Sequence, residues 1–177
     1  MTDAPSCRLL WCHGSLSSPW GTKSLALADV AGEFGLTMEG PDFSDLAAPD
    51  ERVERLLAIL AEDDRPTILA GSSMGGYVAA AASMHARVPA LFLLAPAFYL
   101  PGYAVHVFPS LPGRVTVVHG WDDDVVPVDN AIRFARTHKA TLHVLADGHR
   151  LEKSTETLCV QFARFLACAK ADLEKNA

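Results

Sequence analysis

Two adjacent serines lie in the stretch "GSSMG" at residues 71–75. A serine on a sharp turn between a strand and a helix can act as a nucleophile, and the strained backbone there needs very small residues two positions to either side. Ser73 has glycines at both positions, whereas Ser72 would have Ala70 and Met74 there. The spacing therefore selects Ser73 as the candidate nucleophile, with Ser72 supporting the turn. For the motif taken alone, a glycine turn with two capping serines is the alternative interpretation.

A serine hydroxyl becomes a good nucleophile only when a base takes its proton, and the base works best when a carboxylate orients it. Both kinds of residue follow downstream in the order acid and then histidine. His149 is the candidate base, because it lies in a short loop directly after the last apolar segment, and three consecutive aspartates at 122–124 compete for the acid. A run of acids is often a solvated surface. His106, in a longer loop, stays open as a substrate contact.

Acyl transfer by a serine creates an oxyanion, which needs preorganised N–H donors. The residue after the nucleophile supplies one donor, and here that residue is Met74. The loop "CHGSLSSPWGTK" at residues 12–23 offers the second donor, for which we expect the amide of Ser15, because the preceding glycine lets the chain turn. Leu16 is the alternative donor. We expect His13 to bond within this loop rather than to act as a second base.

The chain alternates between short apolar segments and segments with helical periodicity. The apolar segments are typical of strands buried on both faces of a sheet, and they span 7–13, 36–40, 66–71, 90–95, 114–120 and 140–146. Apolar residues recur at helical spacing in four sets: Leu27, Val30, Ala31 and Phe34; Val53, Leu56, Leu57 and Leu60; Val128, Ala131, Ile132 and Ala135; Leu158, Phe162, Phe165 and Leu166. Asp50 and Ser154 are predicted to be helix N-caps, and Pro127 suits a first helical turn.

Strands that alternate with helices predict a parallel sheet joined by right-handed crossovers and covered by helices on both faces. We therefore expect an α/β fold with six mainly parallel strands. No repeat or linker divides the chain, so residues 1–177 are expected to form a single domain. Ligands of such sheets bind at the carboxyl ends of the strands. The candidate nucleophile, acid and base all follow predicted strands, which places them at that edge.

Composition excludes several classes of partner. The formal charge of −6 at pH 7 argues against nucleic acid, whose phosphates require a basic face. The N-terminus lacks the basic and apolar regions of a signal peptide, and no apolar run approaches about 20 residues. We therefore expect a cytoplasmic protein with no membrane partner. Four cysteines without C-x-x-C spacing favour reduced, largely buried thiols over disulfides or structural zinc: Cys7, Cys12, Cys159 and Cys168.

Four ordered motifs carry a family resemblance: "HGSLSSP" after the first predicted strand, "GSSMGG" after the third, "HGWDDDVVP" after the fifth and "DGH" after the sixth. With them the chain resembles the α/β-hydrolase superfamily over residues 8–166. The early half is similar to small bacterial esterases with H-G-x-x-S-S-P and G-S-S-x-G-G segments, and the later half to carboxylesterases and dienelactone hydrolases. Dienelactone hydrolases use a thiol, whereas this turn carries Ser73.

The resemblance implies an α/β-hydrolase fold with a minimal sheet, no large cap domain and a cofactor-free Ser-His-Asp mechanism, with no metal. The family pattern H-G-x-x-D-x-V-V-P selects Asp123 as the acid, and Asp124 and Asp122 stay open as alternatives. The expected activity is cleavage of carboxylic esters with small or medium acyl groups. A thioesterase or amide hydrolase with the same residues is the alternative, as is a non-catalytic interaction protein. The sequence does not indicate an oligomeric state.

Larger members of the superfamily carry a helical lid in the region where this chain has only residues 96–113. That segment is too short for a cap of several helices. We expect its aromatic residues to line an open apolar groove for substrate together with two residues of the first loop. The residues in question are Phe98, Tyr99, Tyr103 and Phe108 from the segment, and Leu16 and Trp20 from the loop. In the alternative interpretation the aromatic residues only cover the edge of the sheet.

Overall fold

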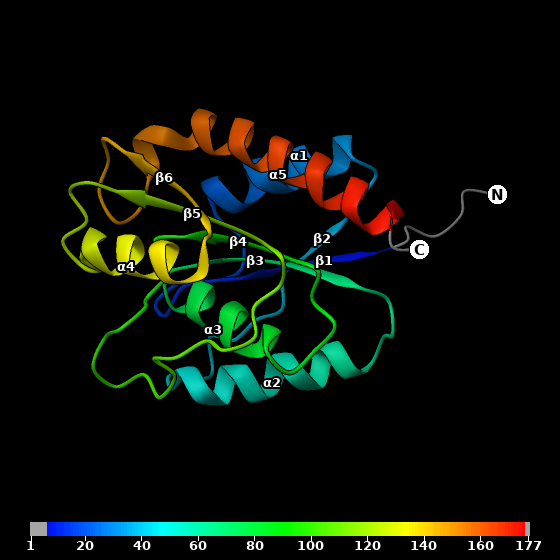
Figure 1. The fold of residues 1–177 in the computed structure, drawn as a ribbon, viewed down its shortest axis with the longest axis horizontal. Helices are drawn as coiled ribbons and strands as arrows, with labels where there is room; N and C mark the ends of the chain where they lie inside the picture. The colour runs from blue at the N-terminus through cyan, green and yellow to red at the C-terminus, as the bar shows by residue number, and fades with distance from the viewer. Residues whose placement is uncertain (1–6, 176–177) are drawn as a thin grey trace.

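The computed structural model describes residues 7–175, which form an α/β fold around one six-stranded sheet (Figure 1). The strands run in the order β2-β1-β3-β4-β5-β6, and all neighbours pair in parallel. Their bounds are Arg8–Cys12 (β1), Met38–Glu39 (β2), Thr67–Ser72 (β3), Ala90–Leu94 (β4), Arg114–Gly120 (β5) and Thr141–Leu145 (β6). The predicted parallel sheet of six strands is confirmed.

Helices cover both faces of the sheet. Their bounds are Thr22–Glu33 (α1), Pro49–Ala61 (α2), Met74–Ser83 (α3), Val128–His138 (α4) and Thr155–Lys175 (α5), and a short 3-10 helix, η1, spans Glu152–Ser154. Figure 1 shows α1 and α5 together on one face, with α2 and α3 on the other. The residues of α4 pack into the same core as those of α2 and α3.

Each face of the sheet has its own hydrophobic core, because successive strand residues point to opposite faces. Leu10 and Cys12 of β1 belong to the core beneath α2, α3 and α4, while Leu9 and Trp11 of the same strand pack under α1 and α5. Both sets are buried, which explains why the strands read as continuous apolar runs in the sequence. The layered arrangement leaves the carboxyl edge of the sheet to the connecting loops.

One predicted helix start needs correction. Helix α2 begins at Pro49 with Ala48 as its N-cap, so the prediction of Asp50 as N-cap is wrong. Proline suits the first helical position because its fixed φ matches the helix, and the helix therefore starts before the aspartate. The side chain of Asp50 instead accepts a hydrogen bond from the Tyr77 hydroxyl at 3.2 Å. Ser154 is the last residue of η1 and directly precedes α5, and its role as an N-cap stays a prediction.

The four cysteines are free thiols, as the sequence predicts. Cys7 and Cys12 are buried, and burial raises the pKa of the Cys12 thiol to about 12. Cys168 is exposed, so the expectation of largely buried thiols fails at this position on the outer surface of α5. Over residues 7–175, no helix is long and apolar enough to cross a bilayer.

Candidate active site

Ser73 is the single residue between β3 and α3, and its backbone has φ 55° and ψ −120°. Residues with a Cβ atom rarely adopt a positive φ, so this turn is strained. Hydrogen bonds hold it in place: the Ser73 N–H donates to the Leu94 carbonyl at 2.9 Å, and the Ser73 carbonyl accepts from the Ala97 N–H at 3.0 Å. The expected strand, turn and helix thus surround the candidate nucleophile.

His149 follows β6 and lies between Ser73 and Asp123. Its Nε2 atom is 3.0 Å from the Ser73 Oγ, and its Nδ1 atom is 2.8 Å from Asp123 Oδ2 and 3.0 Å from Oδ1. With the proton on Nδ1, the ring donates to the carboxylate and its Nε2 can accept the serine proton. The structure therefore brings the three candidate side chains into one chain of hydrogen bonds. Asp122 and Asp124 are exposed and do not contact the histidine.

The carboxylate of Asp123 is fully buried, and four N–H groups converge on it. Besides His149, the donors are the backbone amides of Val125 at 2.9 Å and Val126 at 2.7 Å, and Nε2 of His119 at 3.0 Å. These contacts determine where the carboxylate lies and leave its second oxygen facing His149. Protein groups alone thus fix the position of the buried Asp123 carboxylate.

His119 was not among the residues singled out in the sequence. It is the last-but-one residue of β5, has no exposed surface, and burial lowers its pKa, so the ring is neutral. Its Nε2 faces both the Val126 carbonyl, at 2.9 Å, and Asp123, which places the proton on that nitrogen. The sequence signal was the histidine that opens the motif "HGWDDDVVP".

The two proposed oxyanion donors lie on adjacent segments. Met74 is the first residue of α3, so its N–H has no partner within the helix. The loop after β1 runs beside the turn, since a Cβ atom on Gly14 would lie 3.7 Å from the Ser73 Cβ. Ser15 follows directly in that loop. The backbone of Gly75 lies against the carbonyls of Cys12 and His13, so the helix start and the loop are in direct contact.

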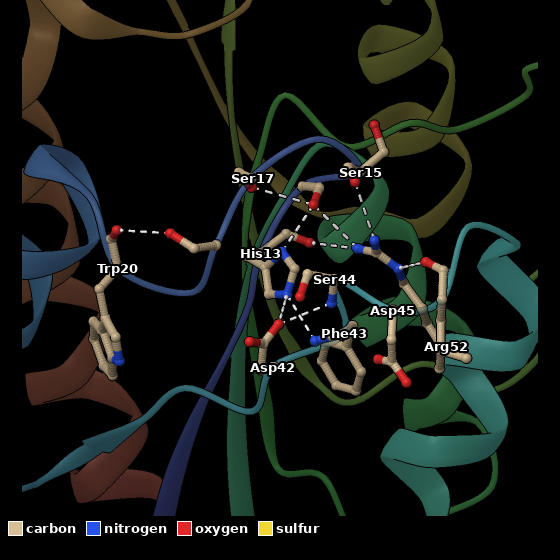
Figure 2. Close-up of polar contacts among 12 residues, drawn as sticks. His13, Ser15, Ser17, Trp20, Asp42, Phe43, Ser44, Asp45 and Arg52 are labelled. Carbon is tan, nitrogen blue, oxygen red and sulfur yellow. Dashed lines mark hydrogen bonds and ion pairs between the residues drawn. The ribbon is translucent and has the colours of Figure 1, made fainter.

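His13 has the structural place expected from the sequence. It is buried, and burial lowers its pKa, which favours the neutral ring. The N–H of Phe43 donates to His13 Nε2 at 2.9 Å, so the proton lies on Nδ1, which donates to the Gly14 carbonyl at 2.9 Å (Figure 2). The ring thereby links the loop after β1 to the segment after β2.

A pocket of about 780 Å³ opens beside Ser73 and His149. The loop residues 13–19, the start of α1 and Val125 form most of its wall. Leu16 lines this pocket and is fully exposed, and its contact with substrate stays a prediction.

Lys23, which the sequence reasoning missed, also lines the pocket. Its Nζ donates to the Arg150 carbonyl at 2.8 Å and contacts the Ser72 Oγ at 3.4 Å, so it links the loop of the candidate base to the serine turn. Desolvation lowers the pKa of this lysine to about 8.

The other expected substrate contacts, Trp20, Phe98 and Tyr99, do not line this pocket. Trp20 is half-exposed, and its ring covers Gly40. Phe98 has no exposed surface and stacks on Phe134 of α4 with ring centroids 4.1 Å apart, so it cannot touch a substrate in this conformation. The ring of Tyr99 lies under Arg133, 4.0 Å from the guanidinium carbon.

The segment 96–113 thus packs its aromatic residues against α3 and α4 rather than over the pocket. Tyr103 packs against Tyr77, and Phe108 against Phe98. His106 stacks on Tyr99 and, like it, does not line the pocket.

Arg52 is a further residue that the sequence reasoning missed. Its guanidinium is buried beneath the loop after β1 and donates to the carbonyls of that loop (Figure 2). The signal was present in the helical spacing, because the buried residues of α2 are Arg52, Leu56 and Leu60, each four positions apart. An arginine at the start of an apolar stripe indicates a buried charge with a specific set of acceptors.

Comparison with known proteins places the chain in a family. The model of the Uncharacterised protein family (UPF0227) matches residues 8–103, which is more than half of the chain. A solved structure of a protein from Xanthomonas campestris pv. campestris, described as belonging to the α/β superfamily of hydrolases, is 34% identical, covers 92% of this chain and 98% of its own, and superposes with a TM-score of 0.83. A search of curated protein sequences found no match.

More distant structures share the fold. Est1E from Butyrivibrio proteoclasticus is 18% identical, with 96% of this chain and 90% of that chain covered and a TM-score of 0.78. A serine hydrolase without a lid from Xanthomonas campestris is 19% identical, with 94% and 84% covered and a TM-score of 0.77. The 34% identical structure, which belongs to a superfamily of hydrolases, indicates hydrolase activity. The chain therefore belongs to UPF0227 and, by its fold and its similarity to the Xanthomonas hydrolase, to the α/β-hydrolase superfamily.

Proposed function

We propose that the protein is a serine hydrolase that cleaves carboxylic esters of small or medium acyl groups through an acyl-enzyme. The observation that carries the proposal is the continuous chain of hydrogen bonds from Ser73 through His149 to Asp123, at 3.0 and 2.8 Å. A strained strand-to-helix turn presents the serine at the edge of a pocket of about 780 Å³. Membership of the α/β-hydrolase superfamily supports the same reaction class.

In the proposed mechanism the Ser73 Oγ attacks the ester carbonyl while His149 Nε2 takes the hydroxyl proton. Asp123 keeps the other ring nitrogen protonated and stabilises the imidazolium that forms. The amides of Met74 and Ser15 donate to the oxyanion. When the tetrahedral intermediate collapses, the C–O bond to the alcohol breaks and His149 returns its proton to the leaving oxygen. Water then attacks the acyl-enzyme by the same steps, and the mechanism calls for no cofactor.

The pocket of about 780 Å³ beside Ser73 has room for a small or medium acyl group. Leu16 offers the apolar surface at its mouth, and no lid covers it among residues 7–175. We expect turnover to rise from acetyl to butyryl or hexanoyl esters of nitrophenol and to fall for long acyl chains. A thioesterase with the same three side chains would instead prefer an acyl-coenzyme A offered in competition with the oxygen ester.

The experiment that tests the proposal measures hydrolysis of nitrophenyl esters by the wild type and by two neighbouring variants. Ser73→Ala removes the candidate nucleophile and is expected to abolish turnover. Ser72→Ala is the matched control, because its hydroxyl has only the weak 3.4 Å contact to Lys23, and it should keep most of the activity. A folded wild-type protein that hydrolyses neither oxygen esters nor thioesters would refute the proposal and favour an interaction protein with a hydrolase fold.

A further inference from the structure

Arg52 is a buried arginine without an acidic partner. It lies in the first turn of α2, only 1% of its surface is exposed, and no carboxylate within residues 7–175 forms an ion pair with it. Desolvation lowers its pKa. Burying a guanidinium without a carboxylate is unfavourable unless backbone acceptors compensate for the lost water. The backbone groups that accept hydrogen bonds from Arg52 therefore indicate why the arginine is buried here.

Four backbone carbonyls accept hydrogen bonds from Arg52. Its Nε donates to the Leu46 carbonyl at 2.8 Å, its Nη1 to the Gly14 carbonyl at 3.1 Å and to the His13 carbonyl at 3.4 Å, and its Nη2 to the Ser15 carbonyl at 3.1 Å. Three of these carbonyls are consecutive in the loop beside Ser73, and Figure 2 shows them converging on one guanidinium. A single planar group thus determines the orientation of successive peptide planes.

The orientation of these carbonyls sets the direction of the amides in the same peptide planes. All peptide bonds in the described structure are trans, and in a trans peptide the N–H points opposite to the C=O. The Gly14 carbonyl shares its plane with the Ser15 N–H, and the Ser15 carbonyl shares its plane with the Leu16 N–H. Both amides therefore point away from Arg52. The same loop residues line the pocket that contains Ser73.

We propose that Arg52 is a positioning residue of the oxyanion hole, which orients the amides of Ser15 and Leu16 toward the reacting carbonyl without touching the substrate. The proposal rests on the function proposed above. A guanidinium bound to a carbonyl also withdraws electron density from that peptide and makes its N–H a stronger donor. Lysine cannot replace it, because one ammonium nitrogen cannot span carbonyls that three guanidinium nitrogens reach together.

The test compares Arg52→Lys and Arg52→Gln with Arg55→Gln. Arg55 is three residues further along the same helix, is partly exposed and pairs with Asp45 at 2.6 and 2.8 Å, so its variant is the matched control. Arg52→Gln removes the buried charge and Arg52→Lys keeps it. A folding defect caused by the charge would therefore give the two variants different stabilities. Ester hydrolysis is measured for kcat and KM, and binding of a trifluoromethyl ketone, which forms a tetrahedral adduct on the serine, reports transition-state affinity.

We expect both Arg52 variants to lose about 10- to 100-fold in kcat, somewhat less than the loss of a whole oxyanion donor, with KM changed little. The affinity for the ketone should fall by a similar factor, because the adduct carries the same oxyanion. Arg55→Gln should behave as wild type. Arg52 variants with unchanged kcat would overturn the proposal. A loss of activity that is proportional to the fraction of unfolded protein would also overturn it, if the folded variant binds the ketone with normal affinity. An inactive wild type would instead overturn the proposed function.

Discussion

At the scale of single residues, the environment of Asp123 separates it from the two aspartates beside it. Its carboxylate is buried and accepts four N–H donors, whereas the side chains of Asp122 and Asp124 are exposed. The family pattern selects the same residue among three identical neighbours. Only the fold explains the selection, because the turn after β5 directs one of the three side chains inward.

Asp123→Asn is expected to lower kcat for ester hydrolysis by about 10³- to 10⁴-fold, because an amide cannot accept on both sides and disturbs the ring tautomer of His149. The variants Asp122→Asn and Asp124→Asn should stay within about twofold of the wild type, since neither side chain reaches the histidine. Steady-state kinetics on a nitrophenyl ester measures all three. An equal loss in all three variants would contradict the assignment of the acid.

Lys23 predicts a dependence of stability on pH. Its pKa in the folded protein is about 8, compared with 10.5 for an ordinary lysine, because the ammonium is desolvated. Between these two values the unfolded chain keeps a proton that the folded chain has released, so the contribution of Lys23 to the free energy of unfolding rises with pH. Below about pH 8 both states are protonated, and the folded state bears the full cost of the desolvated charge.

Urea unfolding of the wild type and of Lys23→Met, repeated from pH 7 to pH 10, measures this contribution. The variant removes both the titrating amine of Lys23 and its hydrogen bonds. Of these two changes, only the loss of the titrating amine makes the difference in stability depend on pH. We expect the stability of the wild type relative to the variant to increase as the pH rises above about 8. A difference that stays constant, or that decreases over this range, would show that the lysine keeps its ordinary proton affinity.

At the scale of elements, Gly75 determines how closely the start of α3 approaches the end of β1. A Cβ atom there would meet the carbonyl of Cys12 and lie 2.6 Å from the carbonyl oxygen of His13. Both partners are backbone atoms that cannot move aside without shifting the loop. The glycine thus lets the helix start and the loop with the proposed oxyanion donors contact the same serine.

Gly75→Ala is expected to destabilise the protein by about 1–3 kcal/mol or more and to reduce activity beyond that loss, because the helix start and the loop must separate. Gly32→Ala in α1 is the control, since a Cβ atom there has no neighbour within 4 Å, and it should leave stability unchanged or raise it by up to about 1 kcal/mol. Chemical denaturation and ester hydrolysis measure both effects. A Gly75 variant as stable and active as the control would mean that the close contact is unimportant.

The central strands could be predicted because β1, β3, β4 and β5 are buried on both faces and read as short apolar runs. The helix starts were harder to predict, as Asp50 shows. Two residues there favour different starts, and the helix begins at Pro49 rather than after an N-cap at Asp50. The aromatic segment after β4 was the hardest. Phe98 is equally suited to a core and to a groove, and only its contact with Phe134 decides between them.

At the scale of the whole molecule, the parallel sheet brings residues distant in sequence to one edge. The candidate nucleophile follows β3, the acid follows β5 and the base follows β6, and 76 positions separate the serine from the histidine that it contacts. Sequence order and motif spacing could predict these three side chains. Arg52 and Lys23 donate hydrogen bonds to carbonyls of distant loops, and those contacts exist only in the folded chain.

The central claim is that Ser73 is a nucleophile activated by His149, and covalent labelling tests it most directly. A fluorophosphonate forms a stable bond only with an activated serine, and peptide mass spectrometry locates the adduct. We predict stoichiometric labelling of the wild type at Ser73, normal labelling of Ser72→Ala, no labelling of Ser73→Ala and strongly slowed labelling of His149→Ala. A folded wild type that stays unlabelled, or an adduct that persists in Ser73→Ala, would contradict the claim.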